Sequence, residues 1–273
     1  MPVCCYTRSH TNRRIHPMFK SLRVFVFAFA FGLPQVLLAQ ETGFLDRSVT
    51  VNGVNHPYQV YIPRGYDGSQ QWPVILFLHG AGERGDDGLK QTQVGLGRAI
   101  RLNPQRWPAI GIFPQVPTSE SWQGDAGRAA IMALDATMQE FTVDSSRQYL
   151  TGLSLGGNGT WYLGYQHTER FAALVAVCGF VGLGDRFPAF LPETSSGPYR
   201  DLAADLAAKS VWIVHGDADR VVPVDESRKI VEALTGAGAE VHYTELPGVG
   251  HNAWDAAYSN EELIDWLFEQ RID

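Results

Sequence analysis

Cysteine is scarce in this chain of 273 residues: only three are present, and Cys4 and Cys5 lie close to the N-terminus. The third, Cys178, has no partner in the rest of the chain, which excludes an internal disulfide framework. It ends an apolar run, and no histidine or basic residue stands beside it to favour a thiolate. We therefore expect a small, buried and unreactive side chain at this position.

Patterns that bind metal ions or phosphate are also missing. His56, His167 and His242 lack ligand-like spacing, and no paired histidines, cysteines or carboxylates form a cluster, so no metal site is predicted. The glycine-rich stretch 152–159 lacks the Gly-Lys-Ser/Thr sequence that holds phosphates and their metal ion. The sequence thus predicts no metal and no other cofactor.

No unbroken apolar run at the N-terminus reaches the ~20 residues that span a bilayer. The run Val24–Leu33 follows five basic residues, contains Gly32, is ended by Pro34, and leads to the small residue Ala39. This order of basic, apolar and small residues is typical of a secretory signal peptide. We predict a signal peptide over residues 1–39, cleaved near Ala39, with Met18 as an alternative start. An N-terminal membrane anchor is the alternative interpretation.

Cleavage would change the charge of the chain. The residues before the cut include five of the 22 lysines and arginines and none of the 29 acidic residues, which leaves 17 basic residues and a net charge of −12. Nucleic acid and anionic membranes are bound by clustered basic side chains, so neither is an expected partner. We expect a secreted or periplasmic protein with no stable membrane anchor after cleavage.

Strand and helix patterns alternate through residues 40–273. Residues 47–63 alternate about Asn52-Gly53, which indicates an antiparallel hairpin. Continuous apolar runs, typical of strands buried on both faces, follow at 74–79, 109–113, 148–152, 171–177, 211–215 and 241–246. Helical patterns lie between them at 126–141, 160–166, 225–235 and 261–268. We predict a single α/β domain, in which a mostly parallel sheet is covered by helices on both faces.

One connection is longer than the others. Residues 179–209 contain prolines and glycines and then a short helical pattern at 201–208, without a strand of their own. Long connections of this kind often carry functional loops. We predict a small lid-like insertion over the carboxyl ends of the strands.

The stretch 149–158, Tyr-Leu-Thr-Gly-Leu-Ser-Leu-Gly-Gly-Asn, joins a strand end to a helix through a tight turn. Gly152 and Gly156 flank Ser154 in a G-x-S-x-G pattern, and their missing side chains allow the chain to return closely and the serine to project above the sheet. A serine hydroxyl is a weak nucleophile on its own, so a histidine and a carboxylate are expected further along the chain. The alternative is an ordinary serine in a glycine-rich turn.

Both groups follow in the chain. Asp219 lies just beyond the apolar run 211–215, and His251 lies in a glycine-rich loop beyond the last run. Ser154, Asp219 and His251 follow the Ser, acid, His order of the α/β-hydrolase triad. We expect His251 to act as the base and Asp219 to fix its tautomer. Asp217 is the alternative acid, but its place directly after the strand better suits a turn cap.

An anion formed during attack by Ser154 needs preorganised donors. The backbone N–H of Leu155, the residue after the nucleophile, is one candidate. The glycine-rich loop 79–85 supplies the other, which we assign to Ala81, with His79 supporting the loop. Three aromatic residues beyond strand ends, Trp122, Phe180 and Trp254, are predicted substrate contacts, with packing in the core as the alternative.

Four motifs together resemble the α/β-hydrolase esterases: His-Gly-Ala-Gly-Glu-Arg-Gly at 79–85, Gly-Leu-Ser-Leu-Gly-Gly-Asn-Gly-Thr-Trp at 152–161, His-Gly-Asp-Ala-Asp-Arg-Val-Val-Pro at 215–223, and Gly250-His251. The resemblance covers residues 44–270 and is to the phospholipase/carboxylesterase and dienelactone-hydrolase-like families, and to secreted polyhydroxybutyrate-depolymerase-like and feruloyl-esterase-like proteins. It implies an α/β-hydrolase fold with about eight strands, no cofactor, and the catalytic and oxyanion roles given above. Leu155 departs from the Met or Gln of many relatives, which leaves the chemistry intact.

These observations predict a secreted serine hydrolase that cleaves carboxylic esters through an acyl-enzyme at Ser154. Small-molecule or polymer-linked esters, with feruloyl, acetyl or short acyl groups, are the expected substrates. A serine peptidase of prolyl-oligopeptidase type is one alternative, disfavoured because no propeller-sized domain precedes the motifs. A catalytically silent binding protein that keeps the fold is the other.

Overall fold

The computed structural model describes residues 1–5, 41–191, 194 and 196–272. Nearly all of the predicted signal peptide, including its cleavage site, lies outside the described residues. The described residues from Glu41 onward form one compact unit. Among the helices described, none combines the length and the apolar character that crossing a membrane requires.

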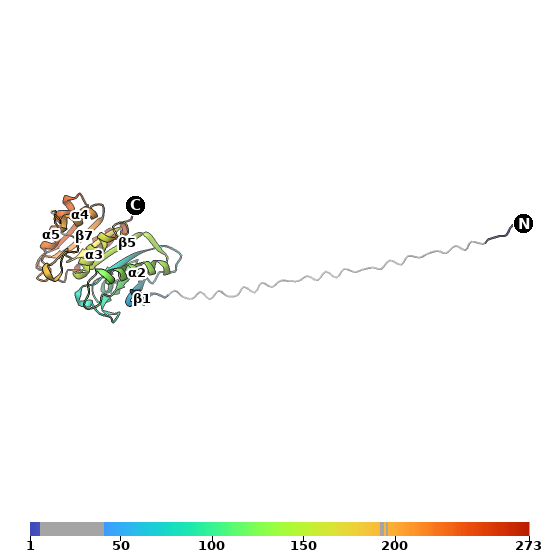
Figure 1. Cartoon of the computed structure of the whole chain (residues 1–273), viewed down its shortest axis with the longest axis horizontal. Helices are drawn as coiled ribbons and strands as arrows, with labels where there is room; N and C mark the ends of the chain where they lie inside the picture. Colours follow the sequence, from blue (N-terminus) through green and yellow to red (C-terminus); the bar gives the residue numbers. More distant parts are fainter. Residues whose placement is uncertain (6–40, 192–193, 195, 273) are drawn as a thin grey trace. The chain divides into compact units, whose positions relative to one another are not determined.

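Eight strands form one sheet in the order β1-β2-β4-β3-β5-β6-β7-β8. Figure 1 colours the chain along its sequence and labels β1, β5 and β7. The hairpin of β1 and β2 turns at Asn52-Gly53, β2 runs antiparallel to β4, and the other neighbouring strands are parallel. The predicted hairpin and mostly parallel sheet are confirmed. The strands are β1 (Gly43–Val51), β2 (Val54–Ile62), β3 (Trp72–Leu78), β4 (Ile110–Pro114), β5 (Val143–Leu153), β6 (Ala173–Val177), β7 (Ser210–Gly216) and β8 (Val241–Leu246).

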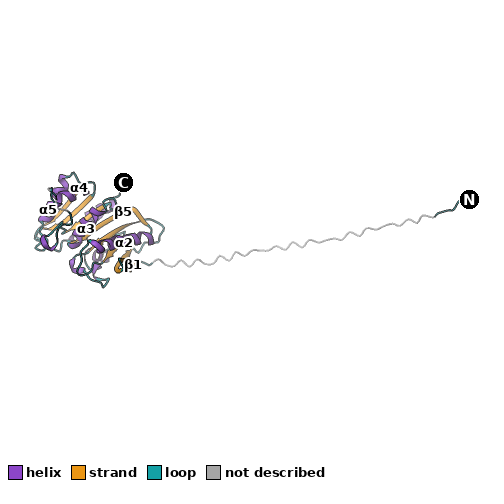
Figure 2. Cartoon of the chain, in the orientation of Figure 1, coloured by secondary structure: helices purple, strands orange, loops and turns teal. Residues whose placement is uncertain are grey.

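Helices cover both faces of the sheet (Figure 2). Successive side chains of a strand point to opposite faces, so in β3 Leu76 packs in one apolar cluster while Ile75 and Phe77 pack in the other. The first cluster includes residues of α2 (Gly124–Glu140), α3 (Leu155–Gln166), α4 (Pro198–Leu206) and α5 (Asp225–Gly236). The second includes residues of α1 (Gly95–Leu102), α6 (Trp254–Ala257) and α7 (Glu261–Glu269).

Short 3₁₀ helices lie in the connections: η1 (Ala81–Glu83), η2 (Lys90–Thr92), η3 (Pro104–Arg106) and η4 (Gly184–Arg186). The predicted helix at 160–166 was placed too late, because α3 begins directly after Ser154. Five consecutive positions with three glycines, at 155–159, hid its first turn, since glycine is a poor helix former. Tertiary packing overrides this preference, and these residues are buried against the sheet.

Candidate active site

Ser154 lies in the turn between β5 and α3 with φ 53° and ψ −114°. Only glycine adopts a positive φ without strain, so the turn must be held by its surroundings. Its N–H donates to the carbonyl oxygen of Val177 over 2.9 Å. A Cβ at Gly156 would lie 1.8 Å from the carbonyl oxygen of Leu78, and one at Gly152 would lie 2.2 Å from that of Gly156. The two glycines are therefore required for the close return of the chain.

The structure brings Ser154, His251 and Asp219 together from three separate loops. The Nε2 atom of His251 lies 2.9 Å from Oγ of Ser154, and its Nδ1 lies 2.7 Å from Oδ2 of Asp219. In this arrangement the neutral ring carries its proton on Nδ1 and accepts the serine proton at Nε2. These are the contacts that a general base and its orienting acid require.

The carboxylate of Asp219 is enclosed by donors. Its side chain is fully buried, and Oδ1 accepts the backbone N–H groups of Val221 and Val222 over 2.8 and 3.0 Å. Burial alone would raise the pKa of Asp219, but the hydrogen bonds from His251 and from these two amides outweigh it and hold the pKa below its ordinary value. Asp217 instead accepts the N–H of Gly248 over 2.6 Å, which is the turn-capping role expected of it.

Ala81 and Leu155 line the same cavity as Ser154. Each is the first residue of a helical turn, η1 or α3, so its N–H has no acceptor within that turn and is available to a ligand. His79 supports the loop: its Nδ1 lies 2.6 Å from the carbonyl oxygen of Gly80, and its Nε2 accepts the N–H of Val116 over 3.0 Å. Burial lowers the pKa of His79 to about 4, which keeps the ring neutral.

A cavity of about 580 Å³ opens at Ser154. Phe180 lines it, with Phe187 at a ring-centroid distance of 5.5 Å, and these rings form an apolar wall. Another part of the lining is polar, because the carboxylate of Glu226 there accepts a hydrogen bond from the hydroxyl of Tyr199 and pairs with the Lys229 ammonium at 2.9 Å. Parts of the predicted lid, at 180–187 and 199, thus line the cavity.

The prediction that Trp122 contacts substrate is wrong. The side chain is fully buried, and its indole N–H donates to the carbonyl oxygen of His79 over 3.0 Å. The ring also packs against α3, where a Cβ at Gly159 would lie 2.6 Å from it. Trp122 therefore braces the loop that carries Ala81 and does not face the cavity.

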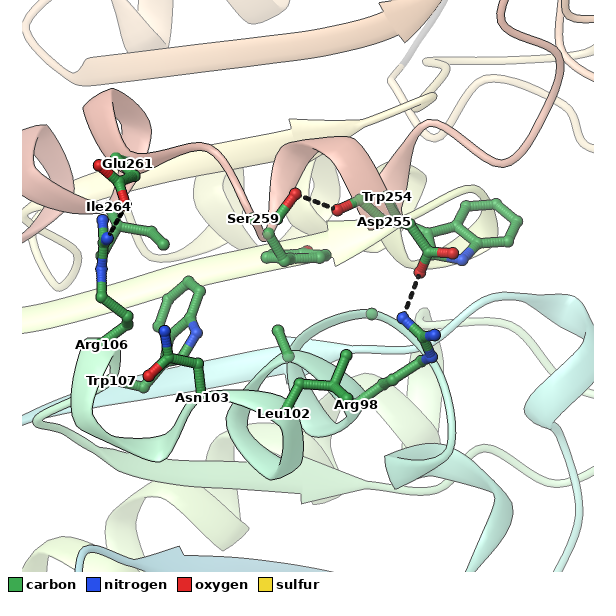
Figure 3. Close-up of a pocket in the computed structure, with 13 residues that line it drawn as sticks. Arg98, Leu102, Asn103, Arg106, Trp107, Trp254, Asp255, Ser259, Glu261 and Ile264 are labelled. Atoms are coloured by element: carbon green, nitrogen blue, oxygen red, sulfur yellow. Dashed lines mark hydrogen bonds and ion pairs between the residues drawn. The ribbon is translucent and has the colours of Figure 1, made fainter.

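Trp254 also lies outside the cavity at Ser154. One side of its indole meets the His251 ring edge to face, with centroids 5.5 Å apart. Trp254 lines a separate crevice of about 140 Å³, bordered by α1 on one side and by α6 and α7 on the other (Figure 3). Two ion pairs, Arg98 with Asp255 and Arg106 with Glu261, bridge this crevice. Trp254 thus packs against His251 and lines this crevice, and its predicted contact with substrate stays a prediction.

Cys178 lies behind the site at the end of β6, with φ 41°. Its Sγ, a carboxylate oxygen of Asp219 and a ring nitrogen of His251 lie within 4.8 Å of one another, the one such grouping among the residues described. Burial strongly raises the pKa of the thiol, and Asp219 and His251 already bond each other. These groups are thus poorly suited to hold a metal ion, and Cys178 is the buried side chain that was expected.

Two supporting residues were missed from the sequence. His215, at the end of β7, and Ser227, in α5, lie fully buried behind Asp219. The only available signal was the place of His215 four residues before the acid, within the motif at 215–223. Phe187 and Tyr199 were missed because nothing in the connection 179–209 marks which of its side chains turn inward.

The chain is similar in sequence to a family model and to several known proteins. A model of the prolyl oligopeptidase family matches residues 192–270. Two fungal proteins described as probable feruloyl esterase C are similar: that of Aspergillus terreus is 25% identical over 69% of this chain, and that of Aspergillus niger is 24% identical over 87%. An uncharacterized secreted protein of Arthroderma benhamiae is 26% identical over 68% of the chain.

Among solved structures, a thermostable esterase is 31% identical over 84% of this chain, with a TM-score of 0.73. The chain spans 63% of that esterase, 65% of the Aspergillus terreus protein and 22% of the Arthroderma protein, but 84% of the Aspergillus niger protein. The order of the strands, the placement of the helices and these similarities all indicate the same fold. The chain has the α/β-hydrolase fold and resembles serine esterases, including feruloyl esterases.

Proposed function

We propose that the protein is a serine hydrolase of carboxylic esters, with Ser154 as nucleophile, His251 as base and Asp219 as the orienting acid. The observation that carries this proposal is the position of His251, whose two ring nitrogens lie 2.9 Å from Ser154 Oγ and 2.7 Å from Asp219 Oδ2. Likeness to esterases supports it but does not replace the geometry.

In the proposed reaction, Oγ of Ser154 attacks the ester carbonyl carbon while its proton passes to Nε2 of His251. The imidazolium, stabilised by Asp219, then gives this proton to the leaving alcohol, and an acyl-serine remains. Water repeats the sequence, with His251 again taking and returning one proton, and releases the acid. The N–H groups of Ala81 and Leu155 would hold the carbonyl oxygen as it becomes negative, and losing one such donor typically costs about 10²–10³ in rate.

The lining of the cavity favours ester substrates that have an aromatic or a short acyl group. Its apolar wall, formed by Phe180 and Phe187, suits an aromatic ring, and the polar part at Glu226 suits a group that forms hydrogen bonds. Feruloyl and acetyl groups, free or attached to a polymer, fit this description.

Covalent labelling tests the enzyme proposal directly. A fluorophosphonate should modify the wild-type protein at Ser154 and leave Ser154→Ala unlabelled. Mass spectrometry of the tryptic peptides identifies the modified residue. A folded wild-type protein that stays unlabelled would instead support the catalytically silent binding protein and exclude the hydrolase.

A peptidase is the second candidate, because the prolyl oligopeptidase model matches residues 192–270. A panel of p-nitrophenyl esters of increasing chain length, methyl ferulate and a prolyl peptide amide separates the two. The esterase proposal requires ester turnover well above amide turnover. Hydrolysis of the amide alone would assign the protein to the peptidases.

We further propose export, with cleavage near Ala39. The basic, apolar and small-residue pattern of residues 1–39 supports it, together with the similarity to a secreted protein. N-terminal sequencing of protein recovered outside the cytoplasm should begin near Gln40, while an intact N-terminus on a membrane-bound form would favour an anchor.

A further inference from the structure

We infer that His215 is a positioning residue for the reaction, held by Ser227, and that the two extend the line of contacts Ser154, His251, Asp219 by two members. The inference rests on the proposed function. Its basis is a pair of close approaches: Nε2 of His215 lies 3.2 Å from Oδ2 of Asp219, and Nδ1 lies 2.6 Å from Oγ of Ser227.

The protonation state of His215 follows from its neighbours. Its ring is fully buried, and burial lowers its pKa, so it is neutral. Nε2 faces two acceptors, Oδ2 of Asp219 and the carbonyl oxygen of Val222 at 3.0 Å, and therefore carries the single proton. Nδ1 then accepts the hydroxyl proton of Ser227. The serine in α5 thus fixes the tautomer of His215, as Asp219 fixes that of His251.

The ring of His215 lies directly beside the carboxylate of Asp219. A carboxylate offers about four lone-pair sites, and three are filled by His251 and the amides of Val221 and Val222. Next to the fourth, Nε2 of His215 lies 3.2 Å from Oδ2, the oxygen that also bonds His251, while it donates its proton to the carbonyl oxygen of Val222. Without the ring of His215, the carboxylate would lose this neighbour and could rotate away from the orientation that aligns His251 with Ser154.

The position of His215 in the sheet makes this support rigid. It lies on β7, opposite Glu245 of β8, and its ring reaches both the loop that carries Asp219 and the first turn of α5. Three elements that meet at the acid are therefore joined through one ring. A purely structural role would predict a loss of stability, whereas a positioning role predicts a loss of rate that depends on Asp219.

The test compares His215→Leu, which removes both ring nitrogens, with His215→Gln, whose amide N–H can replace that of Nε2. With p-nitrophenyl acetate we expect His215→Leu to lower kcat about 10–100-fold, below the ~10⁴ lost when the acid itself is replaced, with KM changed less than about twofold. His215→Gln should recover most of this loss. Ser227→Ala should cost only about threefold, because the Nε2 proton can persist without it.

A double-mutant cycle identifies the route of the effect. In the Asp219→Asn background, His215→Leu should change kcat less than twofold, because the carboxylate that it supports is gone. His56→Leu is a matched control, since His56 is also a strand histidine, 4% exposed, and its Nε2 has no partner among the described residues. It should keep wild-type kcat. Thermal melting of all variants separates folding losses from rate losses.

Equal costs in both backgrounds, or no recovery with glutamine in a folded variant, would overturn the inference and leave the esterase proposal intact. A wild-type protein that hydrolyses no ester and reacts with no fluorophosphonate would overturn the proposed function, and this inference with it.

Discussion

The indole N–H of Trp122 donates to the backbone carbonyl oxygen of His79 over 3.0 Å, and the two rings pack edge to face with centroids 4.9 Å apart. Replacing Trp122 by Phe keeps an aromatic ring but removes this hydrogen bond. A neutral hydrogen bond is worth about 1 kcal/mol, so we expect kcat to fall about fivefold as the loop of Ala81 loosens, with KM little changed. Steady-state kinetics with a p-nitrophenyl ester measures both.

Trp107→Phe is the control for this change. Trp107 is also buried but lines the crevice between α1 and α7, away from Ser154. A rate loss of the same size in both variants would show that Trp122 does not act through the loop 79–85, which carries Ala81.

The strained backbone of Ser154 predicts an unusual stability order. Both Ser154→Ala and Ser154→Gly abolish the proposed nucleophile, but only glycine adopts φ 53° without strain. We expect Ser154→Gly to be more stable than Ser154→Ala by about 1 kcal/mol in chemical denaturation. Equal stability would mean that the turn relaxes to an ordinary conformation once the serine is removed.

Gly156→Ala should prevent correct folding of the turn. The added methyl group would lie 1.8 Å from the carbonyl oxygen of Leu78, which is backbone and cannot move aside without shifting β3. We expect a loss above about 4 kcal/mol, seen as insoluble or unfolded protein. Gly236→Ala, at the end of α5 with open space around its Cβ, should fold normally.

Replacing each of the two acidic residues after β7 by asparagine shows which of them orients His251. Asp219→Asn should lower kcat about 10⁴-fold, because an amide facing His251 favours the wrong tautomer of the ring. Asp217→Asn keeps an oxygen that can accept the N–H of Gly248, and we expect a rate within about twofold of wild type. A larger loss in Asp217→Asn than in Asp219→Asn would reverse the assignment of the acid.

Buried neutral His79 predicts how stability depends on pH. Its pKa falls from the usual ~6.5 to about 4 in the folded protein, so between these values the unfolded chain binds the extra proton. The free energy of unfolding should therefore decrease as pH falls through this window, by roughly 3 kcal/mol from this residue.

Denaturant unfolding at pH 7, 6, 5 and 4 measures this dependence. The wild-type curve includes carboxylates, so the informative quantity is its difference from His79→Gln, which is less stable at pH 7 but should lose less as the pH falls. Parallel curves would exclude His79 as the source.

Short-range patterns in the sequence predicted most of the fold. The hairpin at Asn52-Gly53 and the buried strands are encoded locally, because turn chemistry and runs of apolar residues act over a few positions. The meeting of Ser154, Asp219 and His251 was also predictable, since each follows a strand whose carboxyl end lies at the same edge of the sheet.

Side-chain direction was not predictable in the same way. Trp122 and Phe180 both follow strand ends. Trp122 is buried beneath the loop of His79, whereas Phe180 lines the cavity. The difference depends on contacts between segments far apart in the chain, such as Trp122 with Gly159. The same applies to His215, whose partners in α5 and after β7 are set only by folding.

The parallel register of β5, β6, β7 and β8 has a consequence for how such a protein can diversify. Ser154, Cys178, Asp219 and the loop of His251 all leave the sheet at one rim, while hydrogen bonding between the strands holds the rim in place from behind. The connection 179–209 joins two strands at this rim and takes no part in their ladder of hydrogen bonds. We therefore expect that grafting this segment between relatives would change substrate selectivity while the rim that carries the proposed triad stays in place.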